Sequence, residues 1–230
     1  MLFLSIHAIR NLEGAGRLAE VLAEGKEKTE ASSKRIEQTK KLEADAASEA
    51  ANGFPLLSSH SVVALWSALE DAIPRMCSDW LLKYPRTLER DDFSRVKLPP
   101  HILLLEDRTV AMEEIVLELA RTTQSSLKAG VGRFDALIGA LGIKLSVSKA
   151  LRRDLFELSK VRNVIVHQLG KADRKFVQEC PWLNPKVGDR LRIDPARYGK
   201  YRKVVIEYCV QIVKCGYASG EDRLLDQGLA

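Results

Sequence analysis

The sequence is poor in residues that interrupt helices and in residues that crosslink chains. Only 14 glycines and 8 prolines occur among 230 residues, so we expect long uninterrupted elements. The four cysteines, Cys77, Cys180, Cys209 and Cys215, form no Cys-x-x-Cys pair and have no histidine nearby at metal-ligand spacing. We therefore expect reduced, mostly buried thiols without a disulfide framework, and neither a metal site nor a bound cofactor.

Long hydrophobic runs are also missing. The apolar start of the chain is broken by His7 and Arg10 and has no basic leader, which argues against a secretory signal. The longest uncharged run, from Ala50 to Leu69, is interrupted by glycine, proline and four serines, which excludes a membrane span there. We therefore expect a cytoplasmic protein with no membrane partner.

Apolar residues recur at helical spacing over much of the chain. Between Val62 and Trp80, and again between Leu151 and Leu169, they stand alternately four and three positions apart, which marks one face of an α-helix. Gly170 suits the C-terminus of the second of these helices. Shorter stretches of the same spacing predict further helices over residues 112–119, 134–141 and 198–215.

Two segments depart from this pattern. Residues 17–50 are rich in charged side chains and alanine and have a thin apolar stripe, which favours a solvated helix or pair of helices that ends at Asn52-Gly53-Phe54-Pro55. We therefore divide the chain into a charged helical arm, residues 1–52, and a helical domain, residues 53–230. Residues 187–193 alternate apolar and polar side chains, which predicts a small β-hairpin or an extended loop.

One position of the apolar stripe between Leu151 and Leu169 is filled by an arginine, Arg162. A buried charge without a partner costs much desolvation free energy, so we expect another group to pair with this guanidinium. Glu70 lies one position beside the apolar stripe of the helix predicted around Trp66 and is a candidate for that role.

A titratable side chain follows the arginine on the same predicted helix. His167 stands five residues after Arg162, and histidine exchanges protons near neutral pH. Asn163 and His167 are four residues apart and share a helix face, whereas Arg162 and His167 are about 140° apart on an ideal helix. For both to act on one phosphate, the arginine must curl round the helix or the helix must distort.

This stretch carries a resemblance to a known family. A seven-residue string resembles the Arg-x4-His signature of the HEPN superfamily in its Arg-Asn-x3-His form, namely Val161-Arg162-Asn163-Val164-Ile165-Val166-His167. Residues 131–215 are similar to HEPN proteins of the RiboL-PSP type, and residues 56–126 share the helical pattern. The resemblance implies an all-α, antiparallel helical bundle and a homodimer whose two motif helices line one cleft.

The resemblance also implies an activity and a role for each matching residue. The activity is that of a metal-independent endoribonuclease of toxin or phage-defence systems, with 2′,3′-cyclic phosphate and 5′-hydroxyl products. His167 would act as general base or acid, Arg162 would stabilise the phosphorane charge, and Asn163 would orient one of them. A proton acceptor beside a fixed positive charge suits this chemistry without a metal. An antitoxin or an effector protein is a further expected partner.

Positive charge gathers around the same helix. The whole chain has a formal charge of +5, yet between Ala150 and Lys203 basic residues outnumber acidic ones by eight. We expect basic side chains of this region to contact the RNA backbone, namely Lys160, Lys171, Arg190 and Arg192.

Two other interpretations stay open at this point. Arg162 and His167 would equally suit a buried polar network in a non-catalytic HEPN-like module that binds RNA or mediates protein interaction or dimerisation. An unrelated helical protein is the third possibility. The tyrosines near the basic residues, Tyr198 and Tyr201, have the spacing of core positions, which favours packing over base stacking.

Overall fold

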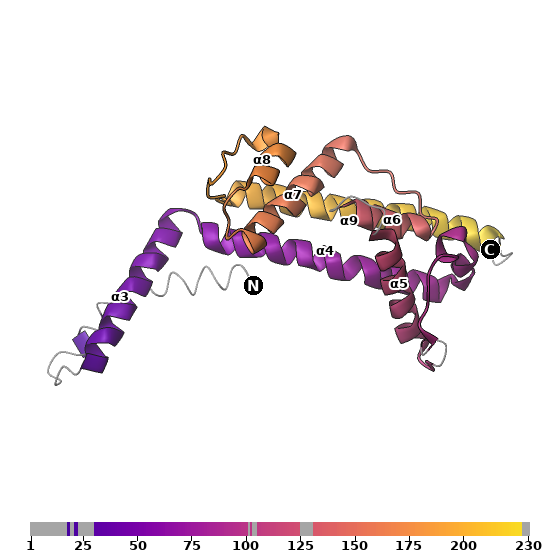
Figure 1. Cartoon of the computed structure of the whole chain (residues 1–230), viewed down its shortest axis with the longest axis horizontal. Helices are drawn as coiled ribbons and strands as arrows, with labels where there is room; N and C mark the ends of the chain where they lie inside the picture. Colours follow the sequence, from indigo (N-terminus) through magenta and orange to yellow (C-terminus); the bar gives the residue numbers. More distant parts are fainter. Residues whose placement is uncertain are drawn as a thin grey trace. The chain divides into compact units, whose positions relative to one another are not determined.

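The computed structural model describes residues 18, 21–22, 30–100, 102, 105–124 and 131–226 of the chain. Within them no strand occurs, and the expectation of an all-α protein is confirmed (Figure 1). The α-helices with described bounds are α3 (Glu30–Ala51), α4 (Pro55–Lys83), α5 (Arg108–Gln124), α6 (Gly132–Ala140), α7 (Lys149–His167), α8 (Arg174–Glu179) and α9 (Pro195–Asp226). Short 3-10 helices are η1 (Pro85–Glu89), η2 (Asp91–Phe93) and η4 (Pro181–Leu183).

The chain divides into two compact units. The first consists of Met1–Val62 and Leu191–Gly199, and the second of Val63–Arg190 and Lys200–Ala230. Most of the expected arm before Glu30 lies outside the described residues, and the expected boundary at residue 52 stays a prediction. No helix in the described part of the chain is long and apolar enough to cross a bilayer.

The first unit contains the turn between α3 and α4. Helix α3 ends at Ala51, and Gly53 follows with a φ of +72°, a conformation that glycine adopts without steric cost. A Cβ at Gly53 would lie 3.4 Å from the ring of Pro195 in the same unit, so a larger residue would be both strained and crowded. The turn predicted at this glycine is confirmed.

The core of the second unit lies among α4, α6, α7 and α9. Trp66 of α4 packs against Phe134 of α6 with ring centroids 5.5 Å apart. A Cβ at Gly220 would come within 2.8 Å of the Tyr84 hydroxyl, which brings the backbone of α9 close to the end of α4, beside which it runs in Figure 1. Tyr201 is fully buried, so its expected core position is confirmed.

A buried carboxylate ties α7 to its neighbours in this core. Glu157, only 1% exposed, accepts hydrogen bonds from the Tyr201 hydroxyl at 2.9 Å and from the Trp182 indole at 2.7 Å. The Lys200 ammonium lies 3.3 Å from the same carboxylate. A buried charge with three donors is well satisfied, and the network holds α7, η4 and α9 in one arrangement.

The segment predicted as a hairpin or a loop is a loop. Val187 and Gly188 form a turn, and Lys171 and Arg190 make an isolated antiparallel bridge. The Ala172 N–H donates to the Asp189 carbonyl at 2.8 Å, and no second strand pair extends the bridge among the described residues. Sequence reasoning missed the six-residue helix α8, which lies between the bridge and η4.

Candidate functional site

Helix α7 positions the three residues of the Arg-Asn-x3-His string. It begins after Ser148, whose Oγ accepts a hydrogen bond from the Leu151 N–H at 3.1 Å, and its last helical residue is His167. The Gly170 N–H donates to the Val164 carbonyl at 3.0 Å, which closes the C-terminus of the helix with a seven-residue hydrogen-bonded loop. The candidate residues therefore lie in the last two turns of a capped helix.

The guanidinium of Arg162 is held on the side of α7 that faces α4. Its Nη2 donates to Glu70 Oε2 at 3.3 Å, and its Nη1 donates to Asn163 Oδ1 at 3.2 Å. The side chain is 21% exposed, and its Nε is buried with no hydrogen-bond partner among the described residues. The carboxylate partner suggested by the sequence is confirmed.

Glu70 is shared between two guanidinium groups. Arg133 of α6 donates to Glu70 Oε1 at 2.5 Å, so one carboxylate faces two cations and the cluster keeps a positive charge. Pro74, four residues later, has no N–H and cannot complete the helical hydrogen bond to the Glu70 carbonyl. A small pocket of about 170 Å³ adjoins this cluster and is lined by Glu70, Pro74 and Arg133 together with apolar side chains.

His167 opens onto a different pocket. This pocket has a volume of about 260 Å³, and Asn163, His167 and Lys160 line it together. His167 itself is exposed. Arg162 does not line this pocket, because α7 continues as a regular helix and the arginine points to Glu70. Asn163 is the link, since it lines the His167 pocket and accepts a hydrogen bond from Arg162.

Lys160 is buried and ion-paired, unlike an exposed lysine that is free to contact RNA. Its side chain is 8% exposed, and its ammonium lies 2.8 Å from the Glu179 carboxylate and 4.9 Å from the centre of the Phe156 ring. A phosphate would have to displace Glu179 to reach this ammonium. Glu179 was not anticipated from the sequence because α8 is short. Its N-cap is nevertheless recognisable, since Asp173 Oδ1 accepts a hydrogen bond from the Phe176 N–H at 2.7 Å.

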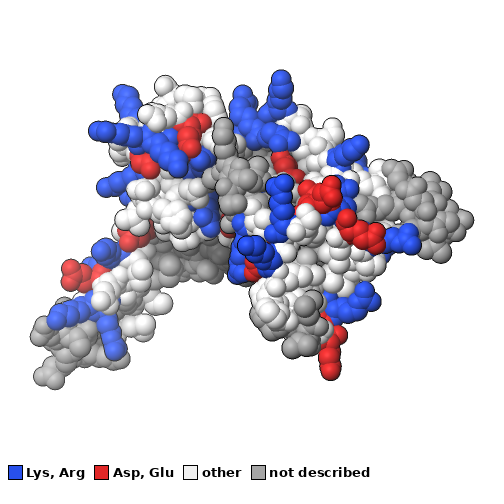
Figure 2. Space-filling view, turned by 45° about the vertical axis from the view of Figure 1, so that its right-hand side comes forward, with Lys and Arg blue, Asp and Glu red and all other residues white. Residues whose placement is uncertain are grey.

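The other expected RNA contacts are exposed. Lys171 and Arg190 face solvent on the two sides of the isolated bridge, which brings them together in the second unit. Arg192 is exposed and belongs to the first unit. Figure 2 shows Lys and Arg side chains in several separate groups on the face in view, with Asp and Glu among them.

Comparisons with known proteins do not add to this geometry. No family model, no curated protein and no solved structure matches the chain. Within the described residues, no three His, Cys, Asp or Glu side chains gather as a candidate metal site. The candidate site therefore consists of the residues of α7 and their contacts.

Proposed function

We propose that the protein is a metal-independent endoribonuclease whose site consists of Arg162, Asn163 and His167, as the resemblance to the HEPN superfamily implies. One observation carries the proposal: Asn163 lines the pocket of His167 and at the same time accepts a hydrogen bond from Arg162. His167 can transfer a proton, Arg162 carries a positive charge, and Asn163 adjoins both. All three lie within six residues of one helix.

The proposed reaction is an internal transesterification. The ribose 2′-oxygen attacks phosphorus as its proton passes to a base, and the bond from phosphorus to the 5′-oxygen breaks as that oxygen takes a proton. His167 is exposed and so accessible to a ribose or a leaving oxygen. To contribute charge to the phosphorane, the Arg162 guanidinium must leave Glu70 and turn round α7 toward the His167 pocket, and Arg133 then remains on the Glu70 carboxylate.

One histidine supplies one of the two proton transfers, and a second copy of the chain would supply the other, as in the composite cleft that the resemblance implies. An exposed apolar stripe on α9 supports a homodimer. Its residues are spaced four, three and four apart on one helix face and are 42–73% exposed, namely Ile206, Val210, Val213 and Tyr217. Glu207 and Lys214 flank the stripe on one side, so two antiparallel copies would place each glutamate opposite a lysine of the other.

Incubation of the purified protein with RNA in EDTA tests the nuclease proposal. Wild type should cut the RNA and leave 2′,3′-cyclic phosphate ends, detected by mass spectrometry. Arg162→Ala and His167→Ala should each slow cleavage by about 100-fold or more. His60→Ala is the matched control, because His60 is also an exposed helical histidine and lies in the first unit. Intact RNA with wild type, or equal cleavage by all variants, would contradict the proposal.

A non-catalytic RNA-binding or protein-interaction module is the second candidate. It is favoured by the position of Arg162, which is engaged by Glu70 and does not line the His167 pocket. Such a module would bind RNA with an affinity that falls as salt rises and would leave it uncut. An antitoxin or effector protein would then be its partner, and Glu70→Gln, which releases Arg162, would leave the RNA uncut as wild type does.

A further inference from the structure

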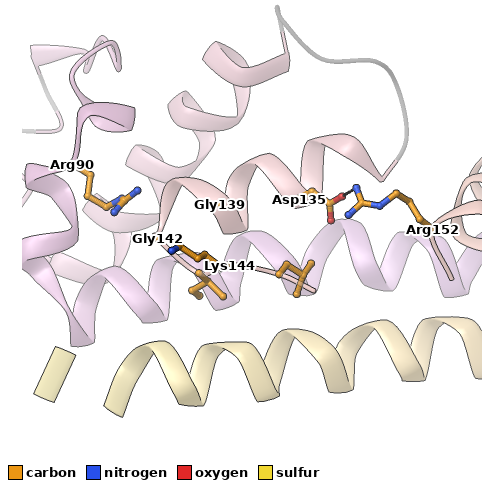
Figure 3. A pocket seen from close by; sticks show the side chains of 8 residues that line it. Arg90, Asp135, Gly139, Gly142, Lys144 and Arg152 are labelled. Atoms are coloured by element: carbon orange, nitrogen blue, oxygen red, sulfur yellow. Dashed lines mark hydrogen bonds and ion pairs between the residues drawn. The ribbon is translucent and has the colours of Figure 1, made fainter. Parts of the chain in front are cut away.

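A third pocket lies well away from the candidate site. It has a volume of about 330 Å³ and is formed by residues before η2, along α6, in the loop after α6, and at the start of α7 (Figure 3). Sites for small molecules begin at about this size. Arg152, which lines this pocket, precedes His167 by 15 positions on α7, or about 22 Å along a helix. The two pockets are therefore separate sites.

Three cations from three parts of the chain line this pocket. Arg90 follows η1, Lys144 lies in the loop after α6, and Arg152 belongs to the first turn of α7. Figure 3 shows Arg90 at one end of the pocket and Arg152 at the other, where the Arg152 guanidinium meets Asp135. Lys144 is exposed and has no ion-pair partner among the described residues.

The carboxylate in the lining is already occupied. Asp135 Oδ2 pairs with Arg152, and Asp135 Oδ1 accepts a hydrogen bond from the Tyr208 hydroxyl at 3.0 Å. Three cations against this single carboxylate leave the lining with a positive charge, of which Asp92 offsets a part through Arg90 at a distance of 3.2 Å. The pocket is thus prepared for an anion, because its own carboxylate cannot satisfy all of its donors.

A hydrogen bond to the backbone anchors one guanidinium of this pocket, and part of the pocket beside it is empty. The Nε of Arg90 donates to the Ala140 carbonyl at 2.9 Å, which holds this guanidinium at the C-terminal end of α6. No atom lies within 4 Å of the position that a Cβ would take at Gly139, so that side of the pocket is unfilled. One guanidinium is anchored, and the space in front of it is free.

We propose that this pocket binds the phosphate group of a small phosphorylated molecule. A phosphate dianion would accept hydrogen bonds from the Arg90 guanidinium, whose Nε is anchored on the Ala140 carbonyl, while Arg152 adds positive charge at the other end of the pocket. The exposed Lys144 side chain adds an ammonium that can donate a hydrogen bond to the bound phosphate. The pocket is distinct from the His167 pocket, with which it shares no lining residue, and the proposal does not depend on RNA cleavage.

Titration calorimetry with defined probes tests the ligand class. Inorganic phosphate and a nucleoside 5′-monophosphate should bind saturably to wild type, and the dicarboxylate succinate should not. Equal affinity for the two phosphates would identify the free ion as the occupant, whereas tighter binding of the monophosphate would identify an esterified phosphate. Absence of saturable phosphate binding, or equal binding of succinate, would overturn the proposal.

Three variants locate the phosphate-binding site. Lys144→Gln should weaken phosphate binding about tenfold, as expected for loss of one charged hydrogen bond. Lys203→Gln, the same change at an exposed lysine of α9, should stay within about twofold of wild type. Gly139→Leu should abolish binding by filling the pocket, with folding checked by circular dichroism. Equal weakening by the two lysine variants, or full binding by Gly139→Leu, would place the phosphate elsewhere.

Discussion

At the scale of single residues, burial controls the chemistry of two thiols. Cys77 and Cys180 are fully buried, whereas Cys209 and Cys215 are half-buried, and all four are free. The expectation of mostly buried thiols holds for two of them, and the expectation of reduced thiols stays a prediction. Burial raises the pKa of Cys77 from its ordinary value of 9.0 to about 12. Burial, with the carboxylates of Glu157 and Glu179, raises the pKa of Cys180 to about 12.

These pKa values predict how stability depends on pH. Above pH 9 the Cys77 thiol ionises in the unfolded chain and stays protonated in the folded one, so the free energy of unfolding should fall as pH rises toward 12. The fall should approach about 1.4 kcal/mol per pH unit for this thiol. Denaturant unfolding at a series of pH values measures it.

Cys77→Ala should remove this thiol's part of the slope. Ile73→Val, a truncation of another buried residue of α4, should lower stability by about 1 kcal/mol and leave the slope unchanged. Identical slopes for wild type and Cys77→Ala would show that the thiol ionises as readily in the folded chain as in the unfolded one.

At the scale of elements, the C-terminus of α7 contains local strain. Leu169 has a φ of +52°, in the left-handed region that side chains with a Cβ rarely adopt, and is 82% exposed. Gly170 follows with a φ of +77°. The predicted helix end at Gly170 is correct to within three residues, and the conformation of Leu169 was not visible in the hydrophobic pattern.

Leu169→Gly should therefore stabilise the protein. Glycine adopts a positive φ without the steric cost, and little packing is lost because the leucine is exposed, so the expected gain is roughly 0.5–1 kcal/mol. Gln168→Gly is the matched control, since Gln168 has a φ of −120° and gains nothing from glycine. Thermal unfolding measures both, and a melting temperature that falls in Leu169→Gly as much as in the control would contradict the expectation.

At the scale of the whole molecule, the exposed stripe of α9 predicts self-association. Val210→Glu places a charge in the centre of the stripe and should weaken dimerisation by about 100-fold, because an apolar contact would bury that carboxylate. Light scattering over a concentration series measures the dissociation constant. Val187→Glu makes the same change at an exposed valine in a loop and should leave association unchanged. A monomeric wild type, or equal effects of both variants, would remove the dimer from the proposal.

Much of the helical architecture was determined by the sequence alone. Spacings of three and four mark a helix wherever one face is buried, so α4, α5, α6, α7 and α9 were each anticipated. Helix α8 was not, because six residues make less than two turns and show no period. The need of Arg162 for a partner also followed from the sequence, because the cost of burying an unpaired charge is independent of fold.

Other features were decided by tertiary structure, because they depend on which faces of distant segments meet. The pairing of Arg162 with Glu70 spans 92 positions, and the same contact turns the arginine away from the His167 pocket. Lys160 became a buried ion-paired residue because α8 brings Glu179 against it. The pocket of Arg90, Lys144 and Arg152 had no motif at all, since its cations come from three separate segments that only packing brings together.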